Sequence, residues 1–159
     1  NTPPRPLLAR IDAGACIGLY YSTEYEAPTG GYARFFHEAG HTIALPYFAD
    51  EGSAVQFREH TDPHGETDLE PGPFGLVQPG HDAPSISPDI VFVPLLGFTE
   101  ELARLGQGGG HYDRWLAAHP RATAIGLAWD VQLCEELPLE PHDVGLSGVV
   151  TPTRMYGLD

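Results

Sequence analysis

The sequence predicts an α/β fold, a three-layer α/β/α sandwich around a mostly parallel sheet. Short apolar runs with β-branched and aromatic residues recur along the chain, and segments with helical spacing lie between several of them. One run, residues 89–94, is apolar enough to be buried on both faces of a sheet. With 159 residues, 42% of them hydrophobic and 19% charged, the chain is expected to form a single domain over residues 1–159.

The strands are expected in apolar runs, and the helices where apolar residues recur at helical spacing. The expected strands are residues 15–21, 42–47, 54–58, 89–94, 124–129 and 148–151. Helices are expected at residues 32–39, which Gly40 ends, and at residues 112–118. Residues 60–88 hold six Pro and four Gly and are expected to form a long irregular loop.

The charge of the chain excludes several kinds of partner. All eight cations are Arg, there is no Lys, and 22 Asp and Glu bring the net charge to −14. Nucleic acid and anionic membranes need clustered cations, so neither is expected as a partner. No apolar run approaches the roughly 18 residues of a membrane span. Cys16 and Cys134 are expected to be reduced thiols, as in a cytoplasmic protein.

The strongest local signal is a glycine-rich segment that runs from Arg104 to Arg114. It reads Arg-Leu-Gly-Gln-Gly-Gly-Gly-His-Tyr-Asp-Arg and precedes an expected helix. Glycines allow backbone N–H groups to turn toward an anion, and the start of a helix adds positive potential. Because an arginine stands at each end, the segment predicts a phosphate site. It lacks the Gly-Lys-Ser/Thr of a P-loop, and it does not fully match the dinucleotide fingerprint.

Two further patterns concern metal ions. Asp113 follows the glycines and Asp143 precedes the last expected strand, so both are candidates for Mg²⁺, which needs few carboxylates beside phosphates. His37-Glu38-Ala-Gly-His41 spells the HExxH motif of zinc hydrolases, which requires both histidines on one helical face. Gly40 should end that helix, so His41 is expected in a loop. The other histidines, His60 among them, are expected at the surface.

Together these segments resemble the 5-formyltetrahydrofolate cyclo-ligase family. The glycine segment is similar to the family signature, and residues 88–98, 125–132, 137–143 and 149–151 are similar to its later strands and loops. Residues 20–26 resemble its Tyr…Glu-x-Asp segment, and residues 40–46 resemble a strand entry, which explains the zinc-like motif. The resemblance covers residues 15–151 and implies a fold like that of the NagB/RpiA/CoA-transferase class.

The resemblance implies an enzyme that uses ATP and Mg²⁺ to convert 5-formyltetrahydrofolate into 5,10-methenyltetrahydrofolate through an N5-iminium phosphate. It implies catalytic roles for Arg104, Tyr112 and Arg114, and Mg²⁺ ligands in Asp113 and Asp143. The implied ATP site comprises Arg104, Leu105, Gly106, Gln107, Gly108, Gly109, Gly110, His111 and Tyr112. The implied folate site comprises Glu24, Phe57, Gly108, Gly109, Gly110, Tyr112 and Gln132. We expect a cytoplasmic monomer acting on a small folate, which can carry a polyglutamate tail.

Several departures from the family pattern keep a second hypothesis open. The family's basic N-terminal helix has no counterpart before Pro3, so we expect either that the chain's first residues are missing from this sequence or that the ATP site is impaired. His111, Gln107, Thr99, Gln78 and Ala27 stand where the family usually has other residues. A paralogue that binds nucleotide or folate without turnover, or with altered specificity, is therefore the alternative. A zinc hydrolase using His37, Glu38 and His41 is the third hypothesis.

Overall fold

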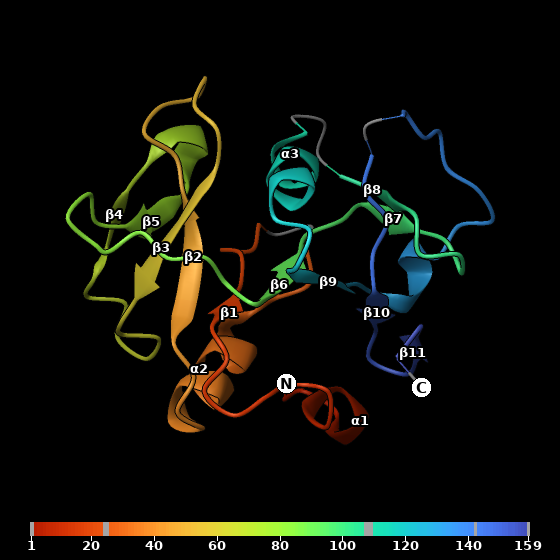
Figure 1. Ribbon diagram of the computed structural model, residues 1–159, viewed down its shortest axis with the longest axis horizontal. Coiled ribbons are helices and arrows are strands. Elements are labelled where there is room, and N and C mark those ends of the chain that lie inside the picture. Colours follow the sequence, from red (N-terminus) through yellow and green to blue (C-terminus); the bar gives the residue numbers. More distant parts are fainter. Residues whose placement is uncertain (1, 24–25, 107–109, 142, 159) are drawn as a thin grey trace.

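Parallel strands form the middle of a seven-stranded sheet. The computed structural model describes residues 2–23, 26–106, 110–141 and 143–158. The sheet comprises β1 (Ile17–Gly18), β2 (Ile43–Tyr47), β3 (Gln56–His60), β6 (Ile90–Val93), β9 (Thr123–Leu127), β10 (Gly148–Val150) and β11 (Met155–Tyr156). Their order is β11-β10-β9-β6-β1-β2-β3, and only the two edge strands, β3 and β11, run antiparallel to their neighbours (Figure 1). The mostly parallel α/β sheet predicted from the sequence is confirmed.

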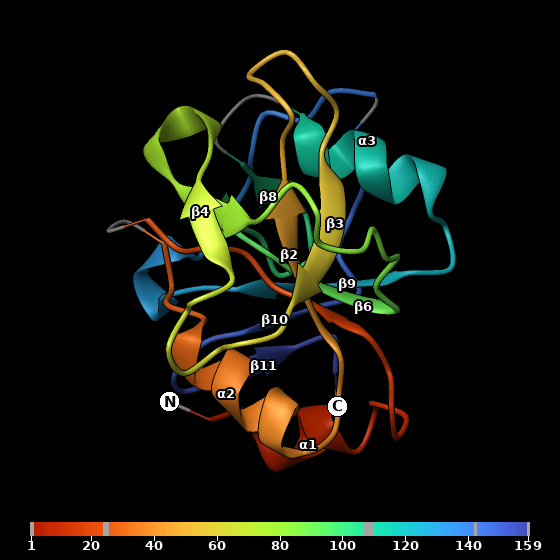
Figure 2. The ribbon, with the colours of Figure 1, turned by 90° about the vertical axis from the view of Figure 1, so that its left-hand side faces the viewer.

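Helices cover both faces of the sheet. Alternate residues of β6 point to opposite sides: Phe92 joins the apolar cluster under α1 (Arg5–Leu8) and α2 (Gly30–Glu38), whereas Val91 and Val93 join the cluster under α3 (His111–Ala118). Figure 2 shows α1 and α2 on one side of the sheet and α3 on the other. The period-two alternation of a strand thus supplies two cores.

The way α2 ends shows that the two histidines of the HExxH pattern do not lie on one helix. The backbone N–H of His41 donates to the carbonyl of Phe36 at 2.9 Å, and that of Gly40 donates to the carbonyl of His37 at 3.1 Å. With Gly40 at φ 93°, these bonds form a Schellman motif that ends the helix. His41 therefore lies beyond the helix, and its Nδ1 is 2.8 Å from the carbonyl oxygen of Ala15. The two histidines share no helical face, so the geometry does not support a zinc hydrolase.

The expectation of a long irregular loop over residues 60–88 is partly wrong, because this segment contains a hairpin. Its strands are β4 (Leu69–Pro71) and β5 (Val77–Pro79), and the 3₁₀ turn η1 (Pro73–Gly75) lies at its tip. The hairpin lies against β2 (Figure 2). The buried side-chain amide of Gln78 ties it there: Nε2 donates to the carbonyl of Phe48, and Oε1 accepts the N–H of Phe48.

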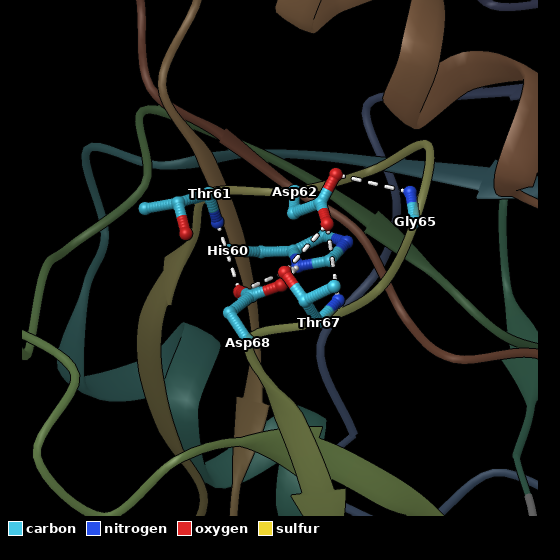
Figure 3. Close-up of polar contacts among 6 residues, drawn as sticks. All are labelled: His60, Thr61, Asp62, Gly65, Thr67 and Asp68. Atoms are coloured by element: carbon cyan, nitrogen blue, oxygen red, sulfur yellow. Dashed lines mark hydrogen bonds and ion pairs between the residues drawn. The ribbon is translucent and has the colours of Figure 1, made fainter.

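His60 is buried, at 4% exposed, so its expected place at the surface is wrong. Its Nδ1 lies 2.8 Å from Oδ2 of Asp68, and the same carboxylate oxygen accepts the backbone N–H of Thr61 (Figure 3). Asp62 closes the loop that follows by accepting hydrogen bonds from Gly65 and Thr67. Two carboxylates thus fix the turn between β3 and β4.

Three short elements complete the described structure. The strands β7 (Gly97–Phe98) and β8 (Arg104–Leu105) pair with each other at the start of the glycine segment, and the 3₁₀ turn η2 (Asp130–Gln132) follows β9. Cys16 and Cys134 are both unpaired and partly buried. Burial, with the nearby Asp89 carboxylate, raises the pKa of the Cys16 thiol to about 11.

In the described part of the chain no helix has both the length and the apolar character needed to cross a membrane.

Candidate active site

The candidate site lies where the parallel strands end. From β1 the chain crosses one face of the sheet through α2 to reach β2, and from β6 it crosses the other face through α3 to reach β9. The two crossovers start from β1 and β6, which are neighbours in the sheet, and run over opposite faces, so the switch point lies between these two strands (Figure 1). Ligands of open α/β sheets bind outside the carboxyl ends of the strands at such a switch point. The segments that follow β1 and β6 therefore border the site.

Arg104 is held in a buried position beside the end of β6. Its side chain is 8% exposed, and Nη1 donates to the carbonyl of Pro94 at 3.4 Å. Among the residues that the structure describes, its Nε–H has no hydrogen-bond partner. A buried donor without a partner costs about 1–3 kcal/mol. Arg104 therefore offers a buried, always charged donor to an anionic ligand.

The two ends of the glycine segment fit an anion site. A Cβ atom on Gly106 would lie 2.5 Å from Nη1 of Arg104, so the guanidinium occupies the space that a side chain would need. At the other end Gly110 caps α3 with φ 69°, a conformation that favours glycine. The first N–H groups of α3 have no partner within the helix and give its start positive potential. Gln107, Gly108 and Gly109 lie outside the described residues.

Tyr112, in the first turn of α3, lies near the Arg104 guanidinium and near enough to the buried Glu26 carboxylate for its charge to act on the phenol. Burial raises the pKa of its phenol well above the usual value; the Arg104 guanidinium lowers it, and Glu26 raises it further. The centre of the ring lies 5.7 Å from the Arg104 guanidinium carbon. The phenol therefore stays protonated at neutral pH. It can donate or accept a hydrogen bond, but it is not a base.

Arg114 and His111 lie one turn apart on α3. Nη2 of the exposed Arg114 donates to Nδ1 of His111 at 3.2 Å, and Nη1 would lie 3.0 Å from a Cβ on Gly110. Burial, and secondarily the Arg114 charge, lower the pKa of His111. The imidazole is thus neutral near pH 7 and can accept this bond.

The structure brings Asp113 and Asp143 to the same place. Oδ1 of Asp113 accepts the backbone N–H of Val144 at 3.1 Å, and Oδ2 of Asp143 accepts that of Glu140 at 2.8 Å. Over the described residues, no three His, Cys, Asp or Glu side chains are grouped as metal ligands. Two carboxylates suit a Mg²⁺ ion that takes its other ligands from phosphate and water. The donor set therefore fits Mg²⁺ bound together with a nucleotide.

Phe57 and Gln132, two residues of the implied folate site, make contacts within the protein. Phe57 is 1% exposed, and its ring packs on Trp115 at 5.0 Å and on Tyr112 at 6.4 Å. Its ring thus supports the ring of Tyr112. Gln132 donates to the carbonyl of Leu95 and accepts the N–H of Trp129, so its amide joins the segments after β6 and β9.

Some features of the site were not predicted. Glu24 lies outside the described residues, but Glu26, 7% exposed, lies close enough to Tyr20 and Tyr112 to raise the pKa of both. The signal in the sequence that could have identified Glu26 is the resemblance of residues 24–26 to the family's Glu-x-Asp pattern. A hollow of about 490 Å³ also opens at this edge of the sheet. It is lined mainly by Ala27, Pro28, Tyr32 and the residues after β9 and β10, including Trp129, which is 42% exposed.

An open, mostly parallel sheet with buried Arg104 beside its switch point defines an α/β protein with a candidate anion-binding site. The family of the protein can also be stated. The chain belongs to the 5-formyltetrahydrofolate cyclo-ligase family, whose model matches residues 8–152. The family resemblance drawn from the sequence is confirmed.

Individual relatives agree with this assignment. The chain is 36% identical over 99 residues to 5-formyltetrahydrofolate cyclo-ligase of Escherichia coli K12, covering 58% of this chain and 54% of that protein. It is 35% identical over 123 residues to the protein of the same name from Mycolicibacterium smegmatis, covering 74% and 63%. The chain thus spans less than two thirds of either relative. The NMR structure of Aquifex aeolicus 5,10-methenyltetrahydrofolate synthetase superposes with a TM-score of 0.72 at 26% identity, covering 91% of this chain and 72% of that one.

Proposed function

We propose that the protein converts 5-formyltetrahydrofolate into 5,10-methenyltetrahydrofolate, with ATP as co-substrate and Mg²⁺ bound beside it. The observation that carries the proposal is the arrangement around the glycine segment. Buried Arg104 stands at one end, the start of α3 stands at the other, and Asp113 and Asp143 lie close by. Family membership over residues 8–152 supports the same reading.

The protein's own groups bind and orient the phosphates. Arg104 meets a phosphate oxygen through its free donor, Arg114 meets a second one, and the glycine segment and the first turn of α3 supply backbone N–H groups. Phosphoryl transfer depends mainly on such positioning and charge neutralisation. Asp113 and Asp143 would hold Mg²⁺, which neutralises phosphate charge when bound.

The folate lies on the other side of the glycine segment in this proposal. Its formyl oxygen attacks the γ-phosphorus, the bond to the bridging oxygen breaks, and ADP leaves. N10 then attacks the activated formyl carbon, the carbon–oxygen bond breaks, and phosphate leaves as N10 loses its proton. Tyr112, protonated at neutral pH, donates a hydrogen bond to the folate, and Glu24 and Glu26 bind its polar edge.

The apolar hollow beside Trp129 supports the proposal as space for a flat ring system. Its volume of about 490 Å³ lies within the range of about 300–1,000 Å³ that is usual for ligand pockets. A cytoplasmic, monomeric enzyme acting on folates that can carry polyglutamate belongs to the same proposal.

An absorbance assay tests the proposal directly. Purified protein is mixed with 5-formyltetrahydrofolate, Mg²⁺ and ATP, and the methenyl chromophore is followed against controls without ATP and with a chelator. Growth of the band only with ATP supports the reaction. If no band grows but calorimetry shows that the folded protein binds ATP or folate, the non-catalytic paralogue replaces the enzyme.

A further inference from the structure

We propose that the rings of Phe48 and Phe74 form an aromatic clamp on His111, and that the clamped imidazole positions the Arg114 guanidinium for nucleotide binding. The inference rests on the proposed function only in taking Arg114 as a phosphate contact. Phe48, Phe74 and His111 are then positioning residues, since none of them needs to touch the nucleotide.

Three rings from separate parts of the chain meet at the start of α3. Phe48 follows β2, Phe74 lies in η1 at the tip of the β4–β5 hairpin, and His111 is the first residue of α3. The ring centres lie 5.0 Å apart for Phe48 and His111, 6.0 Å for Phe74 and His111, and 5.2 Å for the two phenylalanines. All three pairs meet edge to face, a geometry worth about 0.5–1.5 kcal/mol per pair.

The hairpin tip is built to hold its ring there. Phe74 has φ 65°, which a non-glycine residue adopts only when its surroundings hold it. Gln78 of the same hairpin binds both backbone groups of Phe48. An amide can donate to the carbonyl and accept from the N–H at once, which a carboxylate cannot do. One hairpin thus places both rings of the clamp.

The clamp leaves one imidazole nitrogen directed at Arg114. Nη2 donates to Nδ1 at 3.2 Å, while Nη1 lies beside Gly110, where the glycine segment enters α3. An exposed arginine samples many rotamers, and fixing it in advance removes part of the entropy cost of binding.

The test compares four variants of the full chain. Phe74→Ala removes one jaw of the clamp, and His111→Leu removes the acceptor. His111→Asn keeps an acceptor near the Nδ1 position, and Val131→Ala trims a 91%-exposed apolar side chain on η2 as the matched control. Calorimetry measures the Kd of ATP with Mg²⁺ and the Kd of 5-formyltetrahydrofolate. Steady-state kinetics separate KM for ATP from kcat.

Phe74→Ala and His111→Leu are expected to raise the Kd and KM for ATP about three- to tenfold, the equivalent of one lost ring contact or hydrogen bond. The Kd of the folate and kcat should stay within about twofold, and Val131→Ala should match the wild type. His111→Asn, which keeps the acceptor but loses the clamped ring, should raise the Kd for ATP less than His111→Leu does. An unchanged Kd for ATP in both Phe74→Ala and His111→Leu overturns the clamp. So does a loss confined to the folate, which would make Phe74 a substrate contact.

A ligand-free measurement separates this proposal from the proposed function. Nitrogen-15 NMR of the imidazole should show His111 with its proton on Nε2, because Nδ1 accepts from Arg114. A proton on Nδ1 overturns the clamp whatever the protein catalyses. If the wild type binds ATP but forms no methenyl product, the proposed reaction fails, while weaker ATP binding in Phe74→Ala still supports the clamp. A wild type that binds no ATP overturns both.

Discussion

The carboxylate of Asp113 accepts a hydrogen bond from the backbone N–H of Val144, with 3.1 Å between Oδ1 and N. This bond ties the first turn of α3 to the residue after Asp143. Two carboxylates far apart in the sequence are thereby fixed near each other and near the glycine segment. One oxygen of Asp113, Oδ1, is thus engaged with the backbone.

Asp113→Asn should abolish most of the activity while preserving the fold. The amide oxygen can still accept the Val144 N–H, but the negative charge that would hold Mg²⁺ is lost. We expect at least about a 100-fold fall in the rate of methenyl formation, or about 3 kcal/mol of transition-state stabilisation. Rates are measured over a Mg²⁺ titration, with exposed Glu51→Gln as the control. Activity within threefold of the wild type would remove Asp113 from the metal site.

Gly106→Ala should displace Arg104. The new Cβ would lie 2.5 Å from Nη1 of a side chain that is 8% exposed, so the guanidinium must move. Misplacing a positioned charge by about 1 Å costs up to about 100-fold, and we expect KM for ATP to rise about tenfold or more. Gly80→Ala is the matched control, because its nearest neighbour would lie 3.6 Å away, an ordinary contact. Equal KM values for the two variants would contradict the role given to Arg104.

The bond between His60 and Asp68 predicts a stability effect that is separate from activity. Asp68→Ala removes the acceptor for His60, which is 4% exposed, and for the N–H of Thr61 (Figure 3). Unpaired buried donors cost about 1–3 kcal/mol, so urea denaturation should show a loss of about 2 kcal/mol. His81→Ala is the control, since that side chain is 72% exposed and its change should stay within about 0.5 kcal/mol. A loss below that level for Asp68→Ala would show that the pair does not hold the loop.

The central strands could be predicted because each is a local apolar run. β2, β6 and β9 lie within two residues of their expected bounds, and Gly40 ends α2 as expected. The same glycine explains why HExxH is not a zinc motif here. Because Gly40 ends the helix, His41 lies beyond it and cannot share a helical face with His37. Local pattern was sufficient wherever burial on the sheet or a glycine cap fixed the structure.

The β4–β5 hairpin could not be predicted in this way. Its strands have three residues each and include proline, and they are stabilised by the bonds of Gln78 to the backbone of Phe48 and by the turn that His60 and Asp68 fix. Such contacts join residues that no local window contains. The glycine segment and Asp113 are site predictions from the motif, and Asp143 is one from its place before the last expected strand. The clamp residues Phe48 and Phe74 lie in stretches without periodicity.

The last prediction concerns acid stability. Hydrogen bonds from the Thr67 hydroxyl and from the backbone N–H groups of Gly65 and Thr67 lower the pKa of Asp62 from 3.8 to about 2. A depressed pKa means that the folded state favours the carboxylate. Asp62 therefore contributes stability above about pH 4, and this contribution is lost as the pH falls from about 4 to about 2.

Asp62→Asn should be less stable than the wild type at pH 6, and the difference should shrink toward pH 2. Urea midpoints across this range measure it, beside Asp82→Asn, whose side chain is 92% exposed. A difference that does not change with pH would show that the charge of Asp62 plays no part, because the remaining effect would come from the shape of the turn alone.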